Sequence, residues 1–226
     1  RASFNHGATR ELAIERLQED ADFVIFLTQD VLIEDRESFA RLMAPFADER
    51  VGATYGRQLP HVGASSSAAF ERSFSYPGES RRQTFASRQK LGIRAAFLSD
   101  AFAAYRCAAV REAGGFPQLE VSEDMYMGAK LLMSGYEIHY AADATVRHSH
   151  EFTLKSLCKR YSAIGRFQRR EHWIIETFGK SEAEGKKLLL AQLSEAVNKR
   201  SPKLLCDFLL MDAMKFIAFQ YGYRIC

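Results

Sequence analysis

The chain has 226 residues, of which 47% are hydrophobic, and a formal net charge of +3. This size and composition suffice for a full core in one or two domains and exclude a disordered, collagen-like or repetitive chain. No apolar run approaches the roughly 18 residues of a transmembrane helix, and we expect no signal peptide. The cysteines are far apart and indicate the reduced thiols of a cytoplasmic protein, without disulfides or a zinc site: Cys107, Cys158, Cys206 and Cys226.

The charge is unevenly distributed along the chain. Residues 155–226 contain 14 Lys or Arg and 7 Asp or Glu, whereas residues 1–154 contain 17 and 21. A basic, helical and partly apolar region suggests contact with a membrane surface or a phosphate-bearing partner. A solvated helix face explains the charge equally well.

Helices and strands alternate through the first 59 residues. Residues 5–20 and 35–48 have helical spacing of apolar side chains, and Phe23–Leu27 is an apolar run typical of a buried strand. Residues 51–59 are the next strand. This βαβ rhythm predicts an α/β sheet with right-handed crossovers.

Asp30 follows directly after the first predicted strand. Ligands of α/β sheets bind at the carboxyl ends of strands, and a carboxylate there can hold a divalent cation and, through it, a diphosphate. An N-cap or turn residue is an equally good interpretation of Asp30 from its position alone.

The middle of the chain gives weaker signals. Residues 63–76 are rich in Ser, Ala and aromatic side chains, and residues 79–89 are either a mobile loop near the site or plain surface. Residues 94–106 read as a strand crossing the core, with Asp100 as its one acid. Residues 106–113 form a short helix that ends at two glycines.

An acid pair opens the next helix, at residues 122–135. Ser122 is a possible N-cap before Glu123 and Asp124, and Gly135 can end the helix in a left-handed conformation. We expect the helix to bury Met127, Leu131 and Met133, or their neighbours. Such burial fixes the acid pair at the positive end of the helix, although acid pairs often serve only as caps.

Two histidines follow a further strand region at residues 136–146. His148 and His150 are two residues apart on an extended segment, so their side chains point the same way. A neutral imidazole is a good ligand for manganese or zinc-like ions. A His-x-His pair is also common as a structural or exposed feature.

Together these segments resemble the family 2 glycosyltransferases with the GT-A fold, and among them the bacterial rhamnosyltransferases. The matching segments keep the family's order across about 150 residues: 4–13, 26–30, 104–106 with 114–116, 123–124 with 135–136, and 146–150. Residues 160–167 and 215–223 also resemble that branch. The implied fold is a GT-A domain over residues 1–152, a Rossmann-like mixed sheet flanked by helices, followed by a helical region over 153–226.

The resemblance also implies roles for single residues. Asp124 corresponds to the base that deprotonates the acceptor hydroxyl, with Glu123 beside it. Asp30 with His148, or less readily His150, corresponds to the site of a divalent cation, Mg²⁺ or Mn²⁺. Residues implied near the nucleotide sugar are Asn5, Gly7, Arg10, Gln29 and Asp30, and residues implied near the acceptor are Asp100 and Trp173.

The implied reaction is the inverting transfer of a sugar, rhamnose from dTDP-rhamnose, to an acceptor hydroxyl in bacterial polysaccharide synthesis. The acceptor is a glycan or lipid-linked glycan, and no nucleic acid is expected as a partner. A metal neutralises the departing diphosphate, and a placed carboxylate base supplies about 10²–10⁴-fold in rate. Inversion in one displacement needs one base and no covalent nucleophile.

Two features depart from the family pattern. Thr28 stands where many relatives have an acid, so one metal ligand is missing from a strict DxD motif. Relatives also begin with a strand that binds the nucleotide base, and no such strand precedes Arg1. We therefore expect the natural protein to be longer at its N-terminus.

The last third reads as helices over residues 153–178, 181–199 and from Pro202 onward. Residues 168–173 do not match the motif of processive synthases, which favours transfer of a single sugar. Three roles are open for these helices: they could dock on a membrane, pack on the catalytic domain or form an oligomer.

Two other functions stay open for the chain. One is a non-catalytic glycosyltransferase-like scaffold. The other is a nucleotide-sugar pyrophosphorylase-like enzyme, although this enzyme would need a Gly-rich phosphate loop that is not visible.

Overall fold

The computed structural model describes residues 5–17, 20–179 and 182–225. Arg1, Phe4 and Cys226, which entered the sequence predictions, lie outside these ranges. Among the described residues Cys107, Cys158 and Cys206 are free thiols, as predicted.

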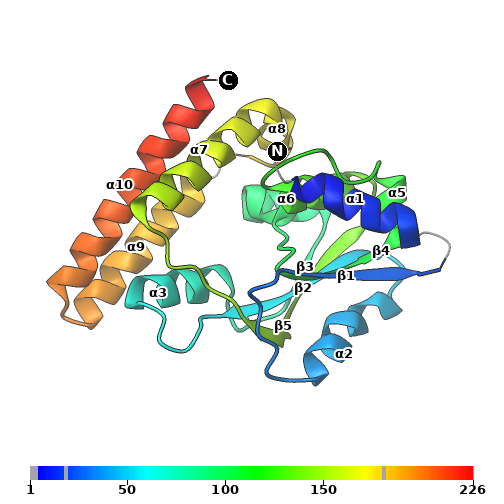
Figure 1. The fold of residues 1–226 in the computed structure, drawn as a ribbon, viewed down its shortest axis with the longest axis horizontal. Helices are drawn as coiled ribbons and strands as arrows, with labels where there is room; N and C mark the ends of the chain where they lie inside the picture. The colour runs from blue at the N-terminus through cyan, green and yellow to red at the C-terminus, as the bar shows by residue number, and fades with distance from the viewer. Residues whose placement is uncertain (1–4, 18–19, 180–181, 226) are drawn as a thin grey trace.

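A mixed five-stranded sheet forms the centre of the described chain (Figure 1). Its strands lie in the order β1-β4-β2-β5-β3. Their bounds are Phe23–Leu27 for β1, Val51–Leu59 for β2, Arg81–Gln83 for β3, Phe102–Arg106 for β4 and Glu137–Arg147 for β5. The mixed sheet of the expected GT-A class is therefore confirmed.

The βαβ pattern predicted that the first two strands, β1 and β2, would be parallel neighbours, and this prediction was wrong. The buried strand β4 inserts between β1 and β2 and is antiparallel to both, because Phe102, Ala103, Ala104 and Tyr105 are completely buried and belong at the centre of the sheet. Among the strands of the described residues, only β2 and β5 pair in parallel. Their parallel pairing matters for the site, because both strands end at the same edge.

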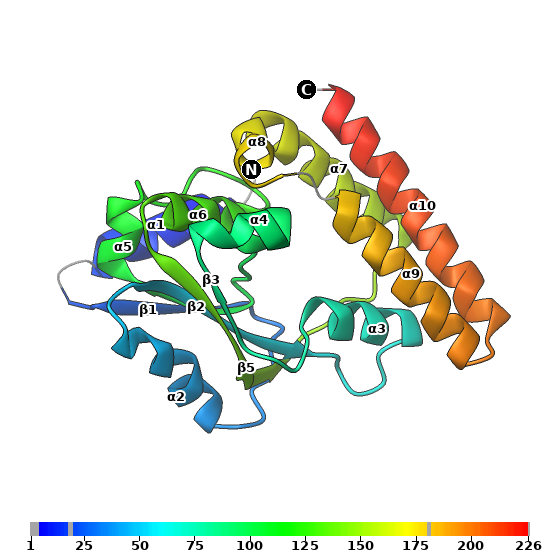
Figure 2. The same cartoon turned by 180° about the vertical axis from the view of Figure 1, so that it is seen from behind.

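Helices cover both faces of the sheet (Figures 1 and 2). One face carries α1, α5 and α6 over the larger core, and the other carries α2 over a smaller core. The helices before the C-terminal region are α1 (His6–Leu17), α2 (Glu37–Met43), α3 (Ser66–Ser75), α4 (Arg88–Leu91), α5 (Cys107–Glu112) and α6 (Glu123–Met133). Three short 3₁₀ turns accompany them: η1 (Ala44–Ala47), η2 (Phe85–Ser87) and η3 (Gly92–Ala96).

The middle of the chain differs most from the sequence predictions. Residues 79–89 contain the short strand β3, which pairs with β5 at the edge of the sheet. Residues 94–106 are a strand only over the last five residues, because 92–96 form the turn η3. The strand region predicted at residues 136–146 is the strand β5.

Helix α6 begins differently from the prediction. Ser122 has a left-handed backbone, with φ of 61°, and its side chain makes no capping hydrogen bond. The buried face is Met127, Leu131 and Leu132, whereas Met133 is 50% exposed. Gly135, with φ of 88°, ends the helix as expected.

The C-terminal region is helical, as predicted, and its most extensive packing contact is between α7 and α10. It comprises α7 (Leu154–Arg170), α8 (His172–Phe178), α9 (Glu182–Asn198) and α10 (Pro202–Ile225). A Cβ atom on Gly165 would lie 2.2 Å from the Phe219 carbonyl oxygen, and one on Gly222 would lie 1.9 Å from the Ser162 carbonyl oxygen. The two backbones therefore approach so closely that only glycine fits. Within the described residues, no helix has the length and apolar character needed to cross a membrane.

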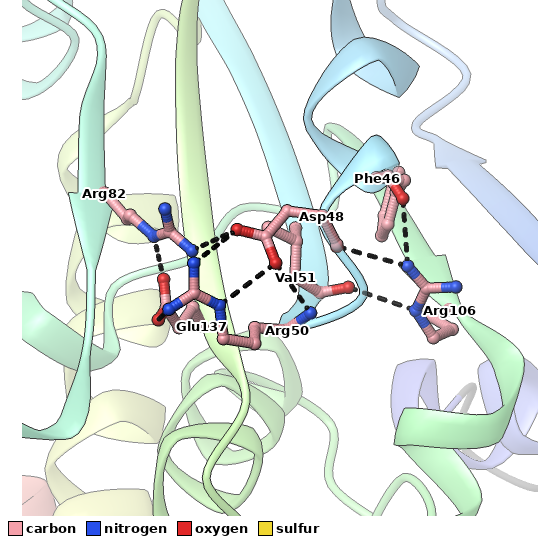
Figure 3. Close-up of polar contacts among 7 residues, drawn as sticks. All are labelled: Phe46, Asp48, Arg50, Val51, Arg82, Arg106 and Glu137. Carbon is pink, nitrogen blue, oxygen red and sulfur yellow. Dashed lines mark hydrogen bonds and ion pairs between the residues drawn. The ribbon is translucent and has the colours of Figure 1, made fainter.

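An ion-pair network ties the sheet together where β2 and β5 begin (Figure 3). Arg82 of β3 contacts Asp48 at 2.6 Å and also pairs with Glu137, the first residue of β5. Arg50 pairs with the same Asp48 at 2.9 Å. The network lies at the opposite ends of β2 and β5 from His148, so it supports the sheet away from the candidate site.

Candidate functional site

The parallel ends of β2 and β5 create one half of the site. Leu59 pairs with Arg147, and the next residue, His148, donates its N–H to the Leu59 carbonyl at 2.8 Å. The loop after β1 joins this edge, because Leu32 and Arg147 exchange two backbone hydrogen bonds of 2.9 Å. These pairings bring Asp30 beside the two histidines.

Asp30, His148 and His150 form one cluster. Asp30 Oδ2 lies 3.3 Å from His148 Nε2 and 3.6 Å from His150 Nδ1. One ligand atom from each side chain lies within 4.8 Å of the other two. The cluster offers one carboxylate oxygen and two imidazole nitrogens, a donor set that suits Mn²⁺ and related ions.

The protonation of His148 supports a cation in this cluster. Burial and the charge of Arg72 lower the pKa of His148 to about 4, so its ring is neutral at physiological pH. Its Nδ1 faces Gln58 Oε1 at 2.8 Å, whereas its buried Nε2 has no hydrogen-bond partner among the described residues. With the ring hydrogen on Nδ1, Nε2 would present a lone pair to a carboxylate oxygen, and a cation between these two electron-rich atoms would satisfy both.

The other two cluster residues are also suited to bind metal. Partial burial acts to raise the pKa of Asp30, but the nearby Thr28 side chain and His148 outweigh it and lower the pKa. Burial lowers the pKa of His150, with Asp30 acting in the opposite direction. An ionised carboxylate and neutral imidazoles are the protonation states that metal binding requires.

A buried group of charges forms the other half of the site. Arg10 of α1 pairs with Glu123 at the start of α6, and its Nε lies 2.6 Å from Asp100 Oδ2. Tyr105 donates its hydroxyl hydrogen to the other Asp100 oxygen. The side chains of Arg10, Asp100 and Glu123 are 11%, 2% and 7% exposed, so the single guanidinium stabilises two carboxylates away from water.

Asp124 stands beside this buried group at the first turn of α6. Its Oδ1 accepts the N–H of Met125 at 2.8 Å, and the residue is partly buried. Burial raises the pKa of Asp124, although the Met125 N–H and Arg10 act to lower it. Burial and the charge of Asp124 likewise raise the pKa of Glu123. A carboxylate with a raised pKa is a stronger base than one in water.

Two connections join the halves. Gln58, which contacts His148, donates its amide N–H to Ser99 Oγ at 2.8 Å. The residue after Ser99 is Asp100, which belongs to the buried group of charges. The positive charge of Arg160 in α7 acts to lower the pKa of both Asp124 and His150, so it acts electrostatically on both halves.

The structure gives other partners to three residues predicted near the nucleotide. Asn5 caps α1 by accepting the Ala8 N–H at 2.8 Å. A Cβ atom on Gly7 would lie 1.8 Å from the Pro117 carbonyl oxygen, so glycine is needed for close packing there. Arg10 is occupied by Asp100 and Glu123. These contacts account for the three residues without a nucleotide, whereas Gln29 is exposed beside Asp30.

The two residues predicted near the acceptor both have partners within the protein. Asp100 is 2% exposed and is bound by Arg10 and Tyr105, and its contact with an acceptor stays a prediction. Trp173 packs edge to face on Tyr126 with ring centres 5.5 Å apart, and its Nε1 donates to Glu171 at 3.0 Å. It therefore joins α8 to α6.

Sequence reasoning missed the polar residues that support the histidine cluster. Gln58, Arg72 and Ser99 come from β2, α3 and the segment before β4, and they meet only in the folded chain. A glutamine near the end of a predicted strand is the one local signal that could have indicated Gln58.

Comparisons with known proteins identify the family of the chain. The model of the family described as "Glycosyl transferase family group 2" matches residues 23–209. The O-antigen chain rhamnosyltransferase RfbN of Salmonella typhimurium is 38% identical over 220 residues, which are 97% of this chain and 69% of RfbN. The O-antigen chain rhamnosyltransferase WbaN of Salmonella anatum is 36% identical over 222 residues, 98% of this chain and 70% of WbaN. The chain belongs to the family 2 glycosyltransferases, and is a glycosyltransferase related to O-antigen rhamnosyltransferases.

A solved structure supports the fold. The mannosyltransferase PcManGT from Pyrobaculum calidifontis, solved in complex with GDP-Man and Mn²⁺, is similar with a TM-score of 0.61 at 15% sequence identity. The match covers 99% of this chain and 67% of PcManGT. At this identity the likeness concerns the fold.

Proposed function

We propose that this glycosyltransferase moves rhamnose from dTDP-rhamnose to a hydroxyl of a glycan or lipid-linked glycan, with inversion at the sugar and with the help of a divalent cation. The observation that carries the proposal is the cluster of Asp30, His148 and His150 at the end of β2 and β5, with its buried Nε2 aimed at a carboxylate. The names of the two rhamnosyltransferase relatives support the choice of sugar and product.

Asp30, His148 and His150 would hold the cation, Mn²⁺ or Mg²⁺. When bound, the cation would neutralise the negative charge of the departing nucleoside diphosphate. The Mn²⁺ and GDP-Man in the similar mannosyltransferase support such a site. Thr28 supplies no carboxylate, so the second imidazole takes the place of the acid that is missing from a strict DxD motif.

Asp124 is the base in this proposal. It lies at the start of α6 with one oxygen held by the Met125 N–H, so its other oxygen can accept the proton of the acceptor hydroxyl. Glu123 and Asp100 are bound by Arg10, which fixes the beginning of α6 and leaves Asp124 as the available carboxylate. One such base suffices for a single inverting displacement.

The experiment compares donors and follows the product. Calorimetry with dTDP-rhamnose, UDP-sugars and GDP-mannose, each with and without Mn²⁺, should show metal-dependent binding of dTDP-rhamnose. Incubation with an acceptor glycan and NMR of the new linkage should show the anomeric configuration opposite to that of the donor. Donor binding without any transfer would instead favour a non-catalytic binding domain, and a retained configuration would exclude the inverting mechanism.

The outer face of α10 supports a peripheral site for an anionic membrane surface. Leu210, Phe216 and Ile217 are 54%, 64% and 60% exposed, and no charged residue interrupts the face. The face consists of Cys206, Leu209, Leu210, Ala213, Phe216, Ile217 and Tyr221. Basic side chains adjoin its C-terminal end, where Arg169 donates to the Tyr223 carbonyl and Arg224 is exposed. An apolar helix face with neighbouring arginines matches the chemistry of anionic lipid headgroups over acyl chains.

Vesicle flotation tests this part of the proposal. The protein should float with vesicles containing phosphatidylglycerol, less so in high salt, and Phe216→Ser with Ile217→Ser should stay in solution. Vesicle binding that depends neither on lipid charge nor on these substitutions would contradict the proposed membrane site. Concentration-dependent dimers in light scattering, abolished by the same substitutions without any lipid binding, would assign the face to a second copy of the chain.

A further inference from the structure

Gln58 is the residue through which the fold controls the orientation of His148. We propose that Gln58 is a positioning residue for the metal site: it fixes the imidazole tautomer of His148 so that Nε2 presents its lone pair to the cation. The inference rests on the proposed metal-dependent function and adds to it a residue that does not touch metal or substrate.

The neighbours of Gln58 determine how its amide is oriented. Its Oε1 accepts a hydrogen bond from Arg72, and its Nε2 donates to Ser99 Oγ at 2.8 Å. A guanidinium has only donors, so a flipped amide would place an NH₂ group against the N–H groups of Arg72. The oxygen of Gln58 must therefore face Arg72, and with it His148.

The oriented amide in turn determines the tautomer. His148 Nδ1 lies 2.8 Å from Gln58 Oε1, and two acceptors at that distance would repel each other. Nδ1 must therefore carry the hydrogen and donate it to Gln58. In a neutral ring Nε2 is then unprotonated, and this is the nitrogen that lies 3.3 Å from Asp30 Oδ2.

The position of Gln58 on β2 suits this task. It is 1% exposed and lies one residue before Leu59, the residue whose carbonyl binds the backbone of His148. The backbone of Leu59 and the side chain of Gln58, which are neighbours at the end of β2, therefore both hold His148. Hydrogen bonds of this kind to a metal-ligating imidazole typically contribute about 10–100-fold to metal affinity.

Another buried glutamine provides a matched control. Gln83 of β3 is also fully buried and donates to the carbonyls of Ala95 and Phe97, at 2.8 and 2.9 Å, but it has no contact with the histidine cluster. We expect loss of either amide to cost stability, but loss of the Gln83 amide should not affect the tautomer of His148.

The test measures Mn²⁺ binding to the full chain by calorimetry, with electron paramagnetic resonance of the bound ion as a second readout. Gln58→Met, which removes the acceptor, should weaken Mn²⁺ binding by about 10–100-fold. Gln58→Glu keeps an oxygen acceptor for Nδ1 and should bind within a few-fold of the wild type. Gln83→Met should bind like the wild type after allowance for its folded fraction, measured by circular dichroism.

A second measurement needs no variant of Gln58. In protein labelled with ¹⁵N-histidine, the His148 signals, assigned by their loss in His148→Asn, should show a protonated Nδ1 and an unprotonated Nε2. The opposite tautomer would overturn the proposal even if Gln58→Met did not fold. Equal losses of Mn²⁺ affinity in Gln58→Met and Gln83→Met would also overturn it, because the effect would then be general destabilisation. Failure of the wild type to bind Mn²⁺ would count against the proposed metal-dependent function, while the tautomer measurement would still test the role of Gln58.

Discussion

Ser99 and Asp100, neighbours in the chain, contact the two different halves of the site. Ser99 Oγ accepts a hydrogen bond of 2.8 Å from Gln58, which holds His148, while Asp100 Oδ2 lies 2.6 Å from Arg10 Nε, which holds Glu123. The segment before β4 thus sets the spacing between the histidine cluster and the acid pair. A shift of this segment should disturb both halves together.

Substitution of Asp30 tests the metal cluster. Asp30→Ala removes the carboxylate that both histidines face, at 3.3 and 3.6 Å, and leaves two imidazoles. We expect Mn²⁺ affinity to fall by more than the about 10–100-fold seen for supporting residues. Calorimetric titration checks this, with the exposed neighbour Gln29→Ala as control. Unchanged affinity in Asp30→Ala would remove Asp30 from the metal site.

Substitution of Asp124 tests the base. Asp124→Asn keeps the shape and the oxygen that accepts the Met125 N–H, but it cannot take a proton from a hydroxyl. Transfer should fall by about 10²–10⁴-fold, while donor affinity stays close to that of the wild type. Initial rates and donor titrations measure the two effects separately. Comparable turnover in the mutant would refute the assignment.

Arg10 is expected to matter for stability more than an exposed arginine. Arg10→Met leaves Asp100 and Glu123 buried without their shared cation, which typically costs about 3–5 kcal/mol. Arg82→Met is the control, because Arg82 also pairs with two carboxylates (Figure 3) but is 41% exposed. Its loss should cost about 0–1 kcal/mol. Urea unfolding of both variants tests the contrast, and equal losses would contradict the view that Arg10 neutralises a buried group.

The stability of the protein should depend on pH through Glu123. Burial and Asp124 raise the pKa of Glu123 above its ordinary value of 4.5, so the folded state holds this proton more tightly than the unfolded state. The contribution of this proton to the free energy of unfolding is fully present when the pH is below the ordinary pKa of Glu123. It is lost as the pH rises toward the raised pKa. Glu123→Gln should therefore flatten the decline of unfolding free energy between about pH 5 and 8. A wild-type profile without such a decline, or one that the substitution leaves unchanged, would count against a raised pKa.

The elements that the sequence predicted well are those with strong local signals. β1 and β2 have the predicted bounds of 23–27 and 51–59, and Pro202 begins α10. β3 was missed because Arg81, Arg82 and Gln83 carry no apolar pattern, and only pairing with the edge of β5 makes them a strand. The insertion of β4 between β1 and β2 is determined by tertiary packing, which the spacing of residues along the chain does not reveal.

In the candidate site, too, local sequence signals were predictable and tertiary contacts were not. Asp30, His148 and His150 were predicted because a strand end and a His-x-His segment are local features that match a family pattern. The partners of Arg10 were not predictable, since Arg10 and Glu123 are 113 residues apart and meet only when α1 packs beside α6. Gln58 and Arg72 acquire their roles from the ends of β2 and β5 and from α3, so they were visible only in the fold.

The most direct test of the account is calorimetric titration of dTDP-rhamnose in the presence of Mn²⁺, with the wild type and with a variant that combines Asp30→Ala and His148→Ala. The account predicts tight binding that requires Mn²⁺ in the wild type and loss of that metal-dependent binding in the variant. Donor binding of equal strength in both proteins, with or without Mn²⁺, would contradict it.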